Sequence, residues 1–160
     1  MDLFESARKN DIEALKANLE NASVDERDTR GSTPLILAAY YQHVEAVKIL
    51  LEAGANPDLI DGMGNTALMG ACFKGYSSVA RVLLEHGAKV DAANGNGATA
   101  LTFAATFGHK DLVELLLSYG ANPYVQDRFG KNPIDHAMIQ ENAECYEILV
   151  ASLATTKSST

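Results

Sequence analysis

The sequence has few of the features that mark secreted, membrane-bound or metal-dependent proteins. No apolar run approaches the roughly 20 residues that a membrane-spanning helix needs. The first residues, MDLFESARKND, are charged and amphipathic, so we expect no signal peptide. There are two cysteines and no Cys-rich framework, which is typical of a reducing compartment. We therefore expect a cytoplasmic protein.

Positive charge is also scarce. The chain of 160 residues has 13 Lys and Arg against 21 Asp and Glu, which gives a formal net charge of -8. Nucleic acids and anionic membranes attract cationic surfaces, so we expect neither to be a general partner. The hydrophobic content of 47% and charged content of 21% are ordinary for a globular protein.

Catalytic and metal-binding motifs are absent from the sequence. We find no nucleophile elbow, no phosphate-binding loop, no HExxH and no Cys/His set with metal-ligand spacing. The sequence therefore predicts no catalytic residues, no metal site, no cofactor and no enzyme activity.

What the sequence does have is a period of 33 residues. Four copies open on Asp or Asn, at Asp28, Asp61, Asn94 and Asp127. A glycine follows three residues later, at Gly31, Gly64, Gly97 and Gly130. Self-similarity at one fixed period indicates a stacked repeat architecture. We expect the opening aspartates to stabilise turns rather than to act as paired catalytic carboxylates.

Each copy is predicted to form a turn, a helix, a second turn and a second helix. Gly31 suits a tight turn with positive φ. Thr33 is a helix N-cap residue, and Pro34 fits the first helical position because its missing N–H is not needed there. Apolar residues at helical spacing within 47–51 predict the second helix, which Gly54 ends.

The pattern D-x-x-G-x-T-P-L-x-x-A-A, followed by L-L-x-x-G-A, resembles the ankyrin repeat and recurs over most of the chain. The resemblance implies an all-α fold, an ankyrin-repeat solenoid of stacked helix-turn-helix units with short β-hairpin-like turns. One position departs from the family, which commonly carries His after Thr-Pro-Leu. The residues at this position are Ile36, Met69, Thr102 and Asp135. The hydrogen bonds of that His must be replaced or lost.

The repeat register predicts one ankyrin-repeat domain over residues 1–154. It consists of an N-terminal capping repeat at 1–27, full repeats at 28–60, 61–93 and 94–126, and a C-terminal capping repeat at 127–152. Residues 155–160, TTKSST, are predicted to be a disordered tail.

The candidate nucleophile is Cys72, with His43 and His109 one repeat away on either side. Cys72 shares the register of Ala39 and Ala105, which are small residues in the predicted core. A buried thiol with no charge to lower its pKa is usually inert, so we interpret Cys72 as a core residue. An enzyme that uses Cys72 or these histidines is the alternative.

The resemblance implies a concave groove, formed by the turn tips and the first helices, in which partners usually bind. The groove positions in this chain hold no Asp or Glu, and their cations are Arg8, Lys9, Arg30, Lys74, Arg128 and Lys131. Arginine and aromatic residues are common anchors of protein interfaces. The predicted binding residues are Arg30, Tyr40, Tyr41, Met63, Phe73, Lys74, Phe107, Arg128, Phe129 and Lys131.

These residues predict a non-catalytic protein–protein interaction module, a monomer that binds one protein partner in its concave groove. With no second domain, it would act as an inhibitor, a chaperone or a tether. The partner should present an acidic and apolar patch, and salt should weaken the complex. Nucleic-acid binding through the basic groove is a further alternative. A competing explanation for the aromatic residues is that they pack between neighbouring first helices.

Overall fold

The computed structural model describes residues 1–158 and contains ten α-helices and no strand in that range. The predicted all-α class is confirmed. The chain forms two compact units, an N-terminal unit of residues 1–89 and a C-terminal unit of residues 90–160. The boundary falls inside the predicted repeat 61–93, in the loop that follows its second helix.

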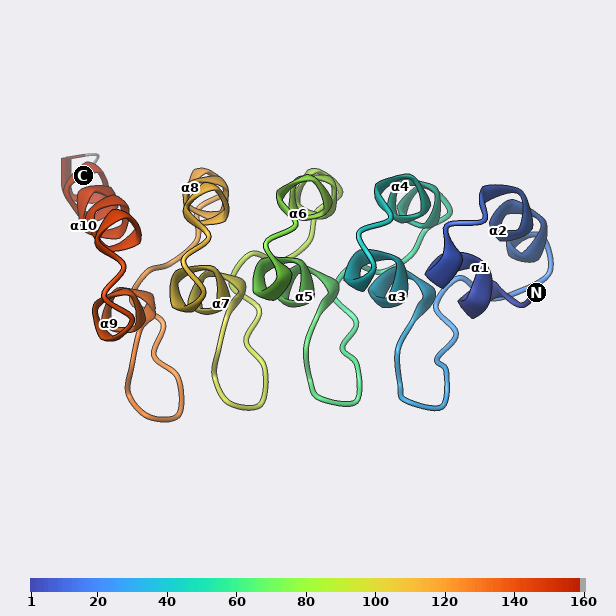
Figure 1. Ribbon diagram of the computed structural model, residues 1–160, viewed down its shortest axis with the longest axis horizontal. Coiled ribbons are helices and arrows are strands. Elements are labelled where there is room, and N and C mark those ends of the chain that lie inside the picture. The colour runs from blue at the N-terminus through green and yellow to red at the C-terminus, as the bar shows by residue number, and fades with distance from the viewer. Residues whose placement is uncertain (159–160) are drawn as a thin grey trace. The chain divides into compact units, whose positions relative to one another are not determined.

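The N-terminal unit contains three helix pairs. They are α1 (Leu3–Lys9) with α2 (Ile12–Leu19), α3 (Pro34–Tyr40) with α4 (Val44–Glu52), and α5 (Ala67–Lys74) with α6 (Ser77–Glu85). Helix α3 contacts α1 and α5, while α4 contacts α2 and α6. The first helices of the pairs therefore form one layer and the second helices another, with the long turns on the side of the first layer (Figure 1).

The C-terminal unit repeats this arrangement with two helix pairs. They are α7 (Ala100–Thr106) with α8 (Lys110–Ser118), and α9 (Pro133–Ile139) with α10 (Ala143–Ser158). Helix α7 contacts α9, and α8 contacts α10. Helix α10 runs to Ser158, beyond residue 154, because no glycine or proline ends it. The predicted disordered tail thus begins within α10, and its residues 159–160 lie outside the described residues.

The predicted N-caps are present at the first helix of each repeat. The Oγ1 atoms of Thr33, Thr66 and Thr99 accept hydrogen bonds from the backbone N–H three residues later, at 3.2–3.3 Å. Asn132 does the same through its Oδ1 atom at 2.9 Å. These bonds satisfy backbone donors that the first turn of a helix leaves open, so the turn pattern sets where each helix begins.

The residue after Thr-Pro-Leu, where ankyrin repeats commonly have His, plays a different role in each unit. In the C-terminal unit, Thr102 Oγ1 accepts from the N–H of Thr99, and Asp135 Oδ2 accepts from the N–H of Asn132, each at 3.0 Å. These contacts close reciprocal capping boxes. In the N-terminal unit the same position holds Ile36 and a fully buried Met69, which add apolar packing instead.

The core of each unit lies between its two helical layers. In the N-terminal unit it is formed by fully buried leucines, which include Leu15, Leu35, Leu50, Leu68 and Leu83. In the C-terminal unit the corresponding residues include Leu101, Leu112, Leu116 and Leu149. Small residues such as Ala38 and Ala71 are also fully buried, which lets the first helices of neighbouring pairs pack closely.

Candidate protein-binding surface

The turn that precedes each first helix is held by its opening Asp or Asn. Asp28 Oδ1 accepts hydrogen bonds from the N–H groups of Arg30 and Ser32, both at 2.9 Å. The N–H of Asp28 donates to the carbonyl oxygen of Ser32, and Gly31 has φ +83°. The same pair of side-chain bonds is made by Asp61, Asn94 and Asp127. The predicted turn-stabilising role of the aspartates is confirmed, and it fixes the turn-tip residues in place.

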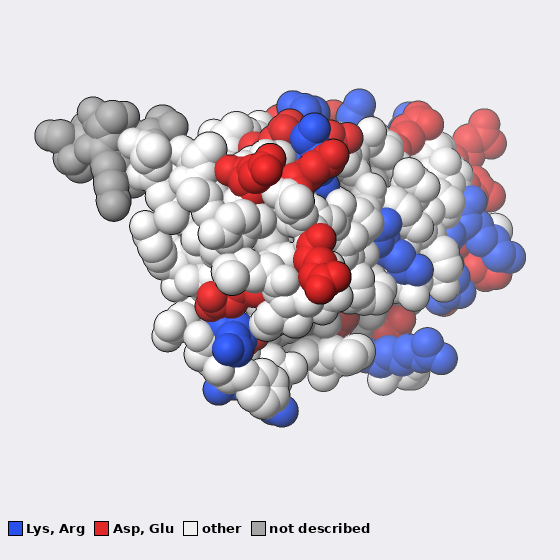
Figure 2. Space-filling view, turned by 60° about the vertical axis from the view of Figure 1, so that its left-hand side comes forward, with Lys and Arg blue, Asp and Glu red and all other residues white. Residues whose placement is uncertain are grey.

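The predicted cations are exposed at the turn tips and on the first helices. Figure 2 shows that both basic and acidic side chains are exposed on the face that it draws. Of the six cations in the predicted groove positions, Lys9 is paired with Glu5 at 2.8 Å. All six are exposed, namely Arg8, Lys9, Arg30, Lys74, Arg128 and Lys131.

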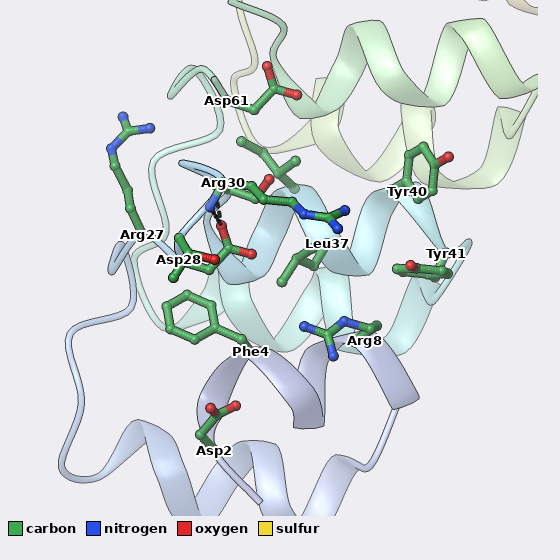
Figure 3. A pocket seen from close by; sticks show the side chains of 13 residues that line it. Asp2, Phe4, Arg8, Arg27, Asp28, Arg30, Leu37, Tyr40, Tyr41 and Asp61 are labelled. Atoms are coloured by element: carbon green, nitrogen blue, oxygen red, sulfur yellow. Dashed lines mark hydrogen bonds between the residues drawn. The ribbon is translucent and has the colours of Figure 1, made fainter. Parts of the chain in front are cut away.

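A hollow of about 940 Å³ opens in the N-terminal unit beside α1, α3 and the turn 28–32 (Figure 3). Phe4, Ile36 and Leu37 contribute its apolar lining. Tyr40 and Tyr41 also line it. Three of the predicted binding residues, Arg30 and these two tyrosines, therefore lie together around one hollow.

The charges around the hollow are balanced, which the sequence did not predict. Its basic residues are Arg8, Arg27 and Arg30, and its acidic residues are Asp2, Asp28 and Asp61. The predicted groove positions hold no Asp or Glu, but the hollow is lined by acidic residues that lie outside those positions. The reason is structural: Asp28 and Asp61 hold their turns, and Asp2 Oδ1 caps α1 by accepting from the N–H of Glu5 at 2.8 Å.

Arg27 was not predicted to belong to this region. Its guanidinium donates to the carbonyl oxygens of Gly31, at 2.9 Å, and Ile60, so it bridges two neighbouring loops. No pattern in the sequence indicates this contact. The N-cap role of Asp2 could have been predicted from the sequence, because Asp2 stands three residues before Glu5, which is the spacing of a capping box.

Two neighbouring turns approach closely beside Arg30. A Cβ atom added to Gly62 would lie only 2.7 Å from the carbonyl oxygen of Arg30. Such a separation is shorter than real Cβ contacts, so a larger residue at this position would displace one of the turns. Gly62 therefore helps to set the position of Arg30 at the edge of the hollow.

The guanidinium groups of Arg8 and Arg30 lie on either side of Leu37 (Figure 3). Among the described residues, neither group forms a salt bridge or a side-chain hydrogen bond. The backbone of both residues is nevertheless held: the carbonyl oxygen of Arg8 is 2.7 Å from Nε2 of His43, and the N–H of Arg30 donates to Asp28. Both arginines are thus available to a ligand from fixed positions.

Tyr40 and Tyr41 form the other side of the hollow. Each is 46% exposed, and their rings meet edge to face with centroids 5.2 Å apart. Nζ of Lys74 lies 4.6 Å from the centroid of the Tyr40 ring, and the Tyr41 ring stacks on His43. Tyr40 thus packs between first helices through Lys74, as the competing explanation requires, while about half of each tyrosine remains open to a partner.

The other predicted residues are exposed but do not line the hollow. In the N-terminal unit, Met63 is 82% exposed at a turn tip and Phe73 is about half exposed beside Lys74. In the C-terminal unit, Phe107 is about half exposed, Phe129 is 72% exposed and Lys131 is exposed. They are exposed, as an interface requires.

Arg128 of the C-terminal unit is partly occupied by contacts within that unit. Its guanidinium lies 4.7 Å from the centroid of the Phe129 ring, and its Nη1 donates to Oδ1 of Asn96 at 3.1 Å. Its backbone N–H donates to the carbonyl oxygen of Asn96 at 2.8 Å. Arg128 therefore links two neighbouring turns, which makes it less available to a ligand than Arg8 or Arg30.

The candidate nucleophile Cys72 is fully buried in α5, and burial raises the pKa of its thiol. A thiol that is protonated and inaccessible at neutral pH is a poor nucleophile. His43 is engaged with the carbonyl oxygen of Arg8. The described residues also contain no group of three or more His, Cys, Asp or Glu that could hold a metal ion. Cys72 is therefore not placed to act as the nucleophile of the enzyme alternative.

Two stretches of the chain, residues 3–94 and 89–159, match the family model described as ankyrin repeats (3 copies). Together these stretches span nearly the whole sequence, and the chain belongs to the ankyrin-repeat family. Ankyrin repeats are generally protein–protein interaction modules and typically non-catalytic. No match was found among curated proteins. Among the described helices, none has both the length and the apolar character that crossing a membrane requires.

Proposed function

We propose that this protein is a non-catalytic module that binds one protein partner through the N-terminal unit and acts as an inhibitor, a chaperone or a tether. The binding face consists of Arg8, Arg30, Tyr40, Tyr41, Phe73 and Lys74. The observation that carries the proposal is that two half-exposed tyrosines adjoin two exposed guanidinium groups around one hollow.

This combination suits a protein interface for a physical reason. Tyrosine and arginine are enriched among the residues whose truncation weakens protein complexes most. Tyr40 and Tyr41 are already restrained by Lys74 and His43, so ordering their rings on binding costs little additional entropy. The binding face is therefore preorganised for a partner.

The charge of the binding face sets the character of the partner. Arg8, Arg30 and Lys74 are exposed on a chain whose net charge is -8. A partner with acidic groups beside an apolar patch would be complementary to them. Added salt should slow association, because screening weakens attraction between exposed charges.

The C-terminal unit carries a second candidate patch. It consists of Phe107, Arg128, Phe129 and Lys131, all of them exposed. Since Arg128 is already bonded to Asn96, we consider this patch the weaker candidate. We further propose that the protein is cytoplasmic, which the two free, buried cysteines support, and that it is a monomer.

The proposal is tested by three baits in native lysate. The first bait is the wild type, and the second is the triple variant Tyr41→Ala/Phe73→Ala/Lys74→Glu. The third is a matched control, Tyr119→Ala/Tyr124→Ala/Lys110→Glu, which changes two exposed tyrosines and one exposed lysine outside the binding face. Circular dichroism is used to check that all three are folded.

One protein should be retained by the wild type and the control and lost with the triple variant. Its purified form should then bind the wild type directly. If the triple variant retains the same protein as the wild type, the partner uses another surface and the assignment of the binding face is wrong. If the control loses the protein while the triple variant keeps it, the C-terminal unit carries the site instead.

A further inference from the structure

We propose that Arg8 and Arg30 form a clamp for one carboxylate of the partner, supplied by a Glu or Asp within an extended acidic and apolar segment. The residue beside this carboxylate would pack on Tyr40 and Tyr41. This inference rests on the proposed function and goes further, because it names the chemical group that the hollow recognises and the two residues that bind it.

The positions of the two arginines are set by contacts that do not involve their guanidinium groups. Arg30 lies at a turn tip that Asp28 holds through two hydrogen bonds of 2.9 Å. Arg8 lies in the last turn of α1, and its carbonyl oxygen is bonded to Nε2 of His43. The two side chains come from different elements and line the same hollow on either side of Leu37 (Figure 3).

The other basic residues nearby differ from this pair because they are already engaged. Arg27, in the same hollow, donates to the carbonyl oxygens of Gly31 and Ile60. Lys9 is paired with Glu5, and Lys74 lies over the ring of Tyr40. Within the described part of the chain, Arg8 and Arg30 have no acidic partner. A carboxylate that contacts both arginines could accept hydrogen bonds from both planar groups.

The charge balance of the hollow favours a single carboxylate over a more highly charged anion. Asp2, Asp28 and Asp61 line the hollow together with the arginines. Like charges placed side by side across an interface are costly. A phosphate dianion or a row of phosphates would therefore meet more repulsion than one carboxylate bound at the arginine pair. This argues for an acidic peptide rather than a phosphopeptide or a nucleic acid.

The apolar lining completes the site. Leu37 lies between the two guanidinium groups, and the half-exposed rings of Tyr40 and Tyr41 lie at the end of α3 (Figure 3). A bound segment that covers these surfaces removes water from the arginines, and attraction between opposite charges is stronger where water is excluded. The hollow is thus suited to an acidic residue with an apolar or aromatic neighbour.

The test uses three tripeptide probes that differ in one side chain. They are N-acetyl-Glu-Phe-Leu-amide, the neutral analogue with Gln in place of Glu, and the analogue with phosphoserine in that place. Each is titrated into the ¹⁵N-labelled full chain, and the Nε–H signals of Arg8 and Arg30 are followed by NMR. The Glu probe should shift both signals and bind about fivefold more tightly than the Gln probe, the scale expected for an exposed ion pair.

Variants then assign the difference to the two arginines. In Arg8→Gln/Arg30→Gln the Glu and Gln probes should bind equally, whereas Arg81→Gln, an exposed cation on α6, should leave the fivefold difference intact. Equal binding of the two probes by the wild type would overturn the clamp. Tighter binding of the phosphoserine probe than of the Glu probe would overturn the assignment to a carboxylate and indicate a phosphopeptide.

The clamp and the proposed function can fail separately. If the partner is lost with the triple variant but binds Arg8→Gln/Arg30→Gln as tightly as the wild type, the binding face is correct and the clamp is wrong. If both the triple variant and Arg8→Gln/Arg30→Gln still bind the partner as the wild type does, the assignment of the binding face is itself wrong.

Discussion

Nε2 of His43 lies 2.7 Å from the carbonyl oxygen of Arg8, and this hydrogen bond joins the end of α1 to the residue that precedes α4. The same imidazole ring stacks against Tyr41, with centroids 6.3 Å apart. One histidine therefore orients a basic residue and an aromatic residue of the proposed binding face.

The first prediction concerns this histidine. His43→Ala should weaken partner binding severalfold, because Arg8 and Tyr41 lose the contacts that hold them. The unfolding free energy should fall by only about 1 kcal/mol, the net value of one hydrogen bond. His86→Ala is the matched control, since Nδ1 of His86, the residue that follows α6, contacts the carbonyl oxygen of Val82 in the preceding turn. Equal losses of affinity in the two variants would show that His43 does not position the binding face.

The second prediction concerns the close approach of two turns at Gly62. Gly62→Ala should destabilise the protein by about 1–3 kcal/mol, the usual cost of overpacking, because its Cβ would lie 2.7 Å from the carbonyl oxygen of Arg30. The variant should also weaken partner binding by moving Arg30. Gly95→Ala, at the equivalent position one repeat later, has nothing within 4 Å of the added Cβ and should be nearly neutral. Chemical denaturation of both variants measures the difference, and equal stability would contradict this account of the turns.

The third prediction concerns pH and the pair formed by Asp127 and His136, whose Oδ2 and Nε2 atoms are 2.7 Å apart. Burial alone would raise the pKa of Asp127, but hydrogen bonds from His136, Lys131 and Phe129 together lower it. A carboxyl group with a lowered folded-state pKa stabilises the fold above its unfolded pKa of about 3.9, and this stability is lost as the pH falls through the folded-state pKa.

His136→Ala removes one of the bonds that lower this pKa. The pKa of Asp127 should rise, and the variant should lose less stability than the wild type as the pH falls below about 5. NMR titration of the Asp127 carboxyl group and denaturation at several pH values measure both effects. An unchanged pKa of Asp127 in the variant would show that His136 contributes nothing to it.

The fourth prediction concerns Cys72. Because this thiol is fully buried and burial raises its pKa, a thiol reagent at neutral pH should label it far more slowly in the native protein than in the unfolded chain. Labelling followed by mass spectrometry of the modified peptide gives both rates. Fast labelling of Cys72 in the native protein would revive the hypothesis of an enzyme with this nucleophile.

The parts of the structure that could be predicted from the sequence are those fixed by local hydrogen bonding. Asp28, Gly31 and Thr33 specify a turn and a helix start whatever surrounds them, since their bonds stay within a few residues. The 33-residue period then repeats this turn along the chain. The same register also assigned Cys72 to the core, where it lies.

The parts that could not be predicted depend on contacts between repeats. The repeat register excluded Asp28 and Asp61 from the predicted binding positions because of their role in the turns, yet both also line the hollow. Arg27 bridges to the carbonyl oxygen of Ile60, 33 residues away, and no residue pattern encodes that contact. The repeat register predicts which residues are exposed. Whether an exposed cation already has a partner depends on contacts with neighbouring loops, which the register does not give.

The central claim is that Tyr41, Phe73 and Lys74 belong to the surface that binds a protein partner. The most direct measurement is the dissociation constant of the captured partner for the wild type and for Tyr41→Ala/Phe73→Ala/Lys74→Glu, at low and physiological salt. We predict a loss of affinity of at least about tenfold in the triple variant, as expected when interface anchors are truncated, and weaker wild-type binding at higher salt. Equal dissociation constants for the two proteins would contradict it.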